Sequence, residues 1–232
     1  MKCKYIITLL FFIGILFPAT LNAQDVINET PGGNGVTKPE PFYRFGVEGG
    51  IQISYPERDG AFKTNFVGIY SFDGGLTVSV TKRFYTGIDL RFCQFATGVN
   101  PKYDTIKTQM ICYMGGLKLG YHSSMAENFM FNGTLSLGEG YVMFNGVPAD
   151  APKTGYNQQS GYFNVSVMEL YNAFEGAYIG FEISFTYLNY NFNPNSIGFQ
   201  NYYNYNNSDV QGATRFISWG FEVHYCLGKK KK

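Results

Sequence analysis

Most of the chain alternates between large apolar side chains and small or polar ones, with a period of two residues. The first segment is the clearest: one face carries Phe45, Val47, Gly49, Ile51 and Ile53, and the other carries Arg44, Gly46, Glu48, Gly50, Gln52 and Ser54. This period places successive side chains on opposite faces of a β-strand. Similar segments start near residues 75, 84, 111, 129, 163, 179 and 217, so the sequence predicts eight strands.

The connections between these segments alternate in length. Three are short (81–83, 122–128 and 171–176), and four are long and rich in Asn, Pro, Gly and Tyr (55–65, 96–107, 145–161 and 193–212). Short turns at one end and long loops at the other are typical of outer-membrane barrels. Asp73-Gly74 is also a hairpin signal and would raise the count to ten strands. An uninterrupted strand is preferred, because the two halves would be too short to cross an apolar band of about 25 Å.

The composition indicates which face meets lipid. Charged residues make up 15% of the chain, against about 25% in an ordinary soluble domain. The polar faces are mostly Gly, Ser and Thr, which would coat a soluble barrel poorly. We therefore expect an all-β, closed antiparallel transmembrane barrel with its apolar face toward lipid. Aromatic residues near strand ends, among them Tyr55, Tyr187, Tyr190 and Phe192, are expected to form interfacial girdles.

The N-terminus has the features of an export signal. Lys2 and Lys4 precede an apolar run over 5–17, and Ala23-Gln24 is a suitable cleavage site. The predicted organisation is a signal peptide (1–23), a flexible periplasmic leader rich in Pro and Gly (24–41), the barrel (42–228) and a basic tail (229–232). The expected location is therefore the bacterial outer membrane, with a monomeric barrel surrounded by lipid.

Several motifs resemble those of the OmpA-like or OmpX-like family of small outer-membrane β-barrels. They are the strand-turn-strand stretch from Gly74 through Thr81-Lys82-Arg83-Phe84 to Leu90, the segment 116–121, and the final strand with Ser218, Gly220, Val223 and Tyr225. The resemblance covers about residues 42–227 and implies the fold, the location and recognition by the barrel-assembly machinery. The chain departs from the pattern by continuing through Cys226 and Leu227 into four lysines.

The inward face of the predicted barrel carries charge. Eight strands enclose a space that side chains can fill, which argues against a wide pore. Charges in such a space must pair or meet water. The sequence predicts a polar lumen network of Glu48, Asp89, Arg91, Lys118, Glu182, Glu222 and His224, acting as a plug. A narrow path for ions or small solutes is the alternative.

Two further features indicate specific contacts. If the third and fourth strands pair about residues 101–102, Cys93 and Cys112 face each other on the inward side, and an oxidising compartment would permit a disulfide. The longest loop mixes Asn with aromatic residues, a composition suited to adaptable binding surfaces. Contact with an extracellular ligand is therefore expected through Phe199, Tyr202, Tyr203 and Tyr205.

Other activities have weaker support. His122-Ser123-Ser124 superficially offers the His and Ser of a lipid A deacylase, but it falls at a short, periplasmic turn, so a lipid-modifying enzyme is the second alternative. The His and Cys residues show no metal-ligand spacing, and no cofactor is expected. A net charge of +1, with four of the basic residues in the tail, gives no basic stripe for nucleic acid. The expected role is structural or surface contact, without catalysis.

Overall fold

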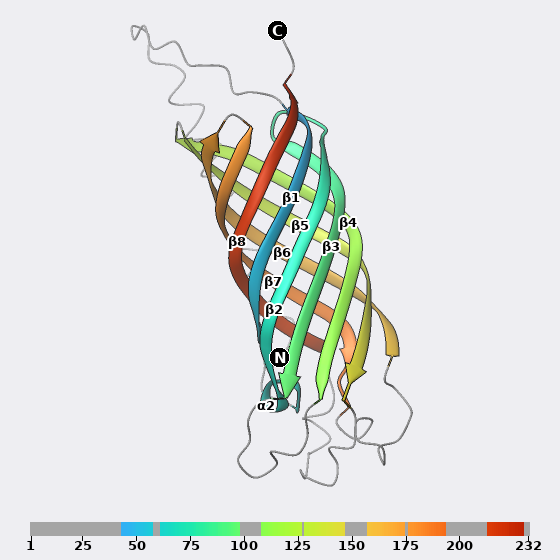
Figure 1. The fold of residues 1–232 in the computed structure, drawn as a ribbon. Helices are drawn as coiled ribbons and strands as arrows, with labels where there is room; N and C mark the ends of the chain where they lie inside the picture. Colours follow the sequence, from blue (N-terminus) through green and yellow to red (C-terminus); the bar gives the residue numbers. More distant parts are fainter. Residues whose placement is uncertain are drawn as a thin grey trace, which may run out of the picture. The chain divides into compact units, whose positions relative to one another are not determined.

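Eight strands form a closed antiparallel barrel in this computed structural model, which describes residues 43–57, 61–97, 108–126, 128–146, 157–174, 176–193 and 213–229 (Figure 1). Each strand pairs with its neighbours in the sequence, and the last strand pairs with the first. The strands are β1 (Tyr43–Pro56), β2 (Phe66–Ser79), β3 (Phe84–Thr97), β4 (Gln109–Ala126), β5 (Phe129–Asn145), β6 (Asn157–Phe174), β7 (Ala177–Asn191) and β8 (Ala213–Lys229). A short helix, α2 (Ala61–Asn65), connects β1 to β2.

The predicted strand count of eight is confirmed. β2 continues through Asp73 and Gly74, which pair with Gly50 and Gly49 of β1 and with Arg91 and Leu90 of β3. The turn signal at this dipeptide is therefore overridden by ladder pairing on both sides. Among the described residues, no helix is long and apolar enough to cross a membrane.

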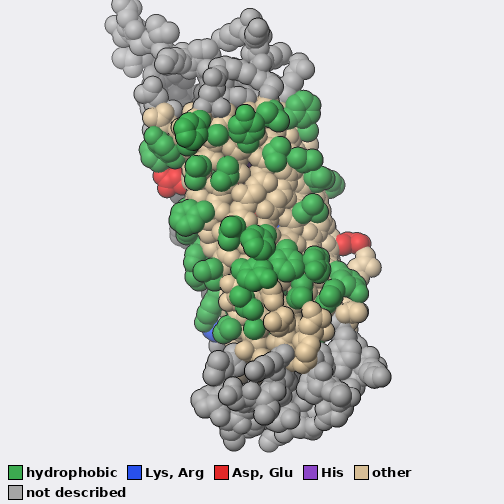
Figure 2. Space-filling view, viewed as in Figure 1, with side chains coloured by type: hydrophobic (Ala, Val, Ile, Leu, Met, Phe, Trp, Pro, Cys, Tyr) green, Lys and Arg blue, Asp and Glu red, His purple; other side chains and the backbone are tan. Residues whose placement is uncertain are grey.

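The barrel exterior is apolar along every strand. Side chains such as Leu117 and Phe221 are about 70% exposed, at 69% and 70%, although they are hydrophobic. Hydrophobic groups spread over the face drawn in Figure 2, with few charged side chains between them. A soluble protein rarely exposes so large an apolar surface, whereas a bilayer requires one. The predicted orientation, with the apolar face toward lipid, is the one that the structure has.

Exterior aromatic residues gather in two groups along the strands. Toward the long connections, Phe72, Phe92 and Tyr113 occupy neighbouring positions, with ring centroids 6.3 and 5.2 Å apart. Toward the short connections, Phe84 lies 5.1 Å from Tyr121, and Phe129 lies 5.3 Å from Tyr171. Two such groups match the aromatic girdles at the two interfaces of a membrane barrel.

Two of the three short connections are tighter than the sequence predicts. β4 extends to Ala126 and β6 to Phe174, which leaves two residues between each of these strands and the next. Gly176, in the turn between β6 and β7, has a φ of 78°, a conformation that suits glycine. The basic tail begins one residue later than expected, because Lys229 is the last residue of β8. The predicted signal peptide (1–23) and leader (24–41) lie outside the described residues.

Inward glycines allow β4 and β5 to pair closely at mid-barrel. Gly116 pairs with Gly138. A Cβ on Gly138 would collide with the backbone of Gly115 and Gly116, whereas a Cβ on the outward Gly133 would meet only the Phe131 ring, at 3.7 Å. The two glycines lie on one strand and differ in the space around them.

We expect Gly138→Ala to destabilise the barrel by about 1–3 kcal/mol, the usual cost of overpacking. Gly133→Ala should leave stability almost unchanged, because its methyl group faces lipid. Urea unfolding of the protein refolded in lipid vesicles, followed by the heat-modifiable shift on a gel, measures both effects. Equal stability of the two variants would contradict this account of the inward glycines.

Candidate functional site

The structure brings all seven predicted lumen residues together inside the barrel. Each is at most 8% exposed. They come from five strands, β1, β3, β4, β7 and β8, and lie in the middle of the barrel and in the half nearer the short connections. The predicted and observed lumen residues agree because side chains alternate strictly along each strand. Each of these residues occupies an inward-facing position of its strand.

Lys118 links two acidic side chains at the centre of this network. Its Nζ contacts Glu48 Oε1 across the lumen, and it lies 3.1 Å from Asp89 Oδ1 on the neighbouring strand. The lysine side chain is completely buried. A buried ammonium would be very unfavourable without such partners, so the two carboxylates are required to hold Lys118 in place.

Arg91 extends the network to the opposite wall. Its Nε lies 3.0 Å from Asp89 Oδ2, and its Nη2 lies 3.2 Å from Glu182 Oε1 on β7. A further hydrogen bond joins Arg91 Nη1 to Ser184 Oγ at 3.4 Å. The Arg91 side chain therefore reaches from β3 across the lumen to β7.

Two members of the network were not among the predicted site residues. Gln52 donates from Nε2 to Glu182 Oε2 at 2.5 Å and to Asp73 Oδ1 at 3.1 Å. Asp73 has the same parity as the inward residues Gly75 and Thr77. Extending the alternation of β2 backward by one step would have placed Asp73 in the lumen, but the turn signal at Asp73-Gly74 obscured it.

The carboxylates of the network outnumber its permanent cations. Five buried or partly buried acids, Glu48, Asp73, Asp89, Glu182 and Glu222, surround two bases, Arg91 and Lys118. His224 adds an imidazole, with Nε2 3.7 Å from Glu48 and 3.5 Å from Glu222. The network thus has three more carboxyl groups than permanent cations.

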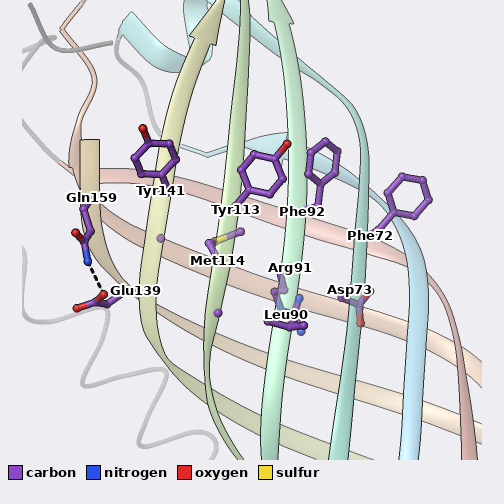
Figure 3. A pocket seen from close by; sticks show the side chains of 12 residues that line it. Phe72, Asp73, Leu90, Arg91, Phe92, Tyr113, Met114, Glu139, Tyr141 and Gln159 are labelled. Carbon is purple, nitrogen blue, oxygen red and sulfur yellow. Dashed lines mark hydrogen bonds between the residues drawn. The ribbon is translucent and has the colours of Figure 1, made fainter. Parts of the chain in front are cut away.

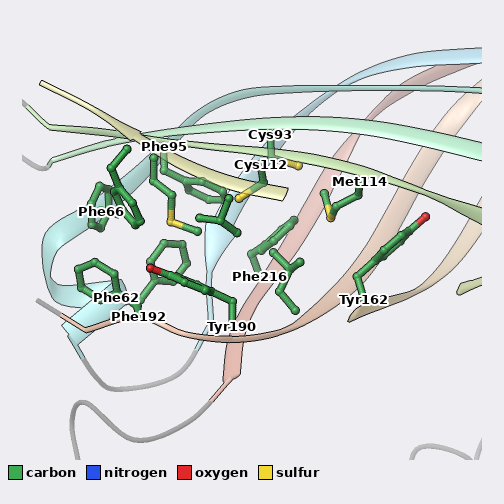
Figure 4. Close-up of a cluster of buried hydrophobic side chains, with 14 residues drawn as sticks. Phe62, Phe66, Cys93, Phe95, Cys112, Met114, Tyr162, Tyr190, Phe192 and Phe216 are labelled. Atoms are coloured by element: carbon green, nitrogen blue, oxygen red, sulfur yellow. The ribbon is translucent and has the colours of Figure 1, made fainter. Parts of the chain in front are cut away.

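The end of the lumen nearer the long connections is apolar. Figure 4 shows a buried cluster of mostly aromatic side chains, which we call the aromatic plug. Phe62 of α2 is part of it, and its ring lies 5.1 Å from that of Phe95. The plug consists of Phe62, Phe66, Cys93, Phe95, Met110, Cys112, Met114, Val142, Phe144, Tyr162, Leu188, Tyr190, Phe192 and Phe216.

The aromatic plug corrects one prediction. Tyr190 and Phe192 were expected in an interfacial girdle, but they are 2% and 3% exposed and lie inside the barrel. The inward face changes from polar to apolar toward the long connections, so a large aromatic residue near a strand end no longer identifies the lipid side. Tyr55 and Tyr187 do lie on the exterior face.

The cysteine prediction is correct in register, while the disulfide itself stays a prediction. Cys93 pairs directly with Cys112, as the loop geometry indicated. Both thiols are free in the structure, and Ser54 Oγ donates to Cys93 Sγ at 3.9 Å. The two thiols therefore pack as small apolar groups in the plug.

A hollow of about 660 Å³ lies on the barrel wall across β2 to β6 (Figure 3). Exposed exterior residues line much of it, including Phe72, Leu90, Tyr113 and Tyr141. Glu139 and Gln159, joined by a hydrogen bond, lie at one side. Most of the lining therefore belongs to the lipid-facing wall, and the lumen residues Asp73, Arg91 and Met114 also border the hollow.

The remaining predicted residues have different outcomes. Phe199, Tyr202, Tyr203 and Tyr205 lie outside the described residues, so their contact role stays a prediction. His122 lies in β4, and its ring stacks on that of Tyr85 at 6.0 Å. Tyr85 in turn donates to Asn132 Oδ1 at 2.8 Å.

We expect Lys118→Met to destabilise the barrel by roughly 3–5 kcal/mol, because it leaves Glu48 and Asp89 buried without their shared cation. Adding Glu48→Gln should recover part of the loss. Lys82→Met, at the exposed turn between β2 and β3, is the control and should change stability by less than about 0.5 kcal/mol. Urea midpoints in vesicles measure the three variants. A Lys118 variant as stable as the Lys82 variant would contradict a role in holding the network together.

Comparison with known proteins finds likeness in structure only. No family model and no curated protein matches the sequence. Solved structures that resemble it include Neisserial surface protein A, at 12% identity and a TM-score of 0.49, covering 79% of this chain and 97% of that one. The attachment invasion locus protein Ail of Yersinia pestis has 14% identity and a TM-score of 0.42, covering 80% and 99%. OprG from Pseudomonas aeruginosa has 14% identity and a TM-score of 0.42, covering 81% and 98%.

These similarities concern the fold and assign no activity. The closed eight-stranded topology and the apolar exterior carry the classification by themselves. By architecture, the chain is a small transmembrane β-barrel of the outer-membrane type, the class that its strand-turn-strand motifs resemble.

Proposed function

We propose that this protein is an outer-membrane barrel that acts without catalysis, as a structural component of the envelope and a platform for surface contact. The single observation that supports this function best is the filled lumen. The ion network occupies the middle and the aromatic plug occupies the end nearer the long connections. In the usual orientation of such barrels, the long connections face outward.

The filled lumen argues against the channel alternative. A conducting path needs water along the whole barrel, or polar groups free to replace the hydration shell of an ion. Arg91 and Lys118 are instead fixed by ion pairs to Asp89, Glu182 and Glu48. Beyond them, Phe66, Phe95 and Phe216 are at most 1% exposed. An ion would have to displace both layers in series.

The surface-contact part of the proposal rests on the scaffold and the composition of one loop. β7 and β8 pair as a hairpin, and the loop between them is rich in Tyr and Asn. Tyr supplies rigid amphipathic area and Asn supplies hydrogen bonds, a combination found in adaptable binding loops. A polar or carbohydrate ligand fits this chemistry.

The alternative of a lipid-modifying enzyme is supported by one local sequence motif. His122, Ser123 and Ser124 lie in β4 close to the short connection to β5. In the proposed orientation this end faces the periplasm, away from the lipid A of the outer leaflet. The proposed function therefore gives these residues a packing role, and His122 already stacks on Tyr85.

We expect no unitary currents from the wild-type protein in planar lipid bilayers. Because two barriers act in series, neither the plug variant (Phe66→Ala, Phe95→Ala, Phe216→Ala) nor the network variant (Arg91→Ala, Glu182→Ala) should conduct by itself. Only the combination should open a path. Heat-modifiability on a gel shows which variants are folded. Regular unitary currents from the wild type would contradict the proposal of a closed lumen and would support the narrow-channel alternative.

Deleting residues 194–208 should abolish binding to immobilised matrix proteins or to a glycan array while leaving the barrel folded. The deletion spares Phe192, which belongs to the aromatic plug. Deleting 147–156 from another long connection is the matched control and should leave binding intact. Retention of all binding by the first deletion, or its loss in both, would contradict a contact role for this loop.

A further inference from the structure

Three unpaired ligand atoms converge where the last strand meets the first. Glu48 Oε2, Glu222 Oε1 and His224 Nε2 are buried and have no hydrogen-bond partner. All three lie within 4.8 Å of one another. Glu222 is completely buried, and His224 is 8% exposed. Buried polar atoms are normally paired, so three orphaned atoms at one point indicate an absent partner.

The spacing of these atoms fits a small cation. His224 Nε2 lies 3.5 Å from Glu222 Oε1 and 3.7 Å from Glu48 Oε2. Zinc binds nitrogen and oxygen ligands at about 2.0–2.2 Å in tetrahedral geometry, which places neighbouring ligand atoms roughly 3.3–3.6 Å apart. The observed distances are close to this range.

The surrounding contacts orient the ligands. The other oxygen of Glu48, Oε1, is held by Lys118, which leaves Oε2 for a second cation. Glu222 receives no hydrogen bond from an N–H or hydroxyl donor on either oxygen, and its carboxyl group lies close to those of Asp73 and Glu182. Gly50, which pairs with Glu222 across the strands, has no side chain, and a Cβ there would lie 3.3 Å from the Glu222 Cγ. The glycine thus leaves room for this carboxylate.

The charge of the network also favours a bound cation. Five carboxylates face two permanent cations, an excess of three negative charges if all are ionised. A divalent ion would reduce the excess to one. Such an imbalance in a space of low polarity is very unfavourable without a compensating ion or proton.

A second acidic group, Asp73 with Glu182 and Glu222, is a weaker candidate. Arg91 pairs with Glu182, and Gln52 donates to both Glu182 and Asp73. Glu182 and Asp73 therefore have partners already. The group also lacks an imidazole.

We propose that a divalent transition-metal ion, with Zn²⁺ as the best match, binds between Glu48, Glu222 and His224. One imidazole and two carboxylates suit zinc better than calcium or magnesium, which prefer oxygen ligands alone. The ion joins β1 to β8 and therefore fastens the seam that closes the barrel. The aromatic plug closes the other end of the lumen, so the ion enters from the side of the short connections. Its path passes the half-buried Cys226, which lies on the same face of β8.

The membrane-extracted protein, stripped of metal with a chelator, tests this site by titration with Zn²⁺ and by elemental analysis. We expect one Zn²⁺ per chain and a higher unfolding temperature with the ion. His224→Gln and Glu222→Gln should weaken Zn²⁺ binding by more than the factor of about 10–100 typical of an outer-shell change. His122→Gln changes the other histidine of the chain and should bind Zn²⁺ like the wild type.

Absence of Zn²⁺ binding by the wild type would overturn the proposal, as would binding that His224→Gln leaves unchanged. A gel shift on heating verifies that each variant is folded. If the His224 or Glu222 variants do not fold, X-ray absorption of the Zn²⁺-loaded wild type decides the question, because the site requires one imidazole ligand. If the wild type binds no Zn²⁺ and Glu222→Gln leaves the stability of the metal-free protein unchanged, a proton on Glu222, and not a metal ion, compensates the carboxylates.

Discussion

The circumference of eight strands is the constraint on which the rest of this structure depends. Every second side chain must point into a space just wide enough to be filled by side chains, and every other one must meet lipid. The interior therefore has to solve a packing problem and a charge problem together. Lys118 and Arg91 solve both in the middle of the barrel, because each is long enough to cross the lumen and each brings a charge that the acidic side chains need.

The lumen is divided along its length into two chemically different halves. In one, each fixed ion pair depends on neighbours from other strands, so the strands hold one another in register. In the other, Phe62, Phe95, Phe192 and the residues around them pack as in the core of a soluble protein. Excluding water from one end lowers the local polarity and strengthens the ion pairs beyond it. The aromatic plug and the ion network therefore support each other.

Alternation was sufficient to predict the strands, the lipid-facing side and the seven lumen residues, because parity is a local property of the chain. Together with a loop centred at residues 101–102, it also predicted the pairing of Cys93 with Cys112. The prediction failed where the residue type suggested one face of the strand and the position in the alternation gave the other. Tyr190 is aromatic and near a strand end, yet its parity is inward, and only the closed barrel shows that the inward face is apolar there. The clustering of Glu48, Glu222 and His224 could not be predicted from alternation either, because closure of the barrel joins positions more than 170 residues apart in sequence.

The pairing of β1 with β8 has a consequence for how the molecule forms. Residues 43–56 obtain their second partner only from residues 213–229, so the longest-range contacts of the fold are also the ones that complete it. Until then the sheet has two open edges, which lipid cannot satisfy. The entropy of closing so long a loop must be overcome before those contacts form. Assembly is therefore expected to be a late, cooperative event that depends on the C-terminal strand, and a chain that lacks this strand has no partially closed form that is stable in a bilayer.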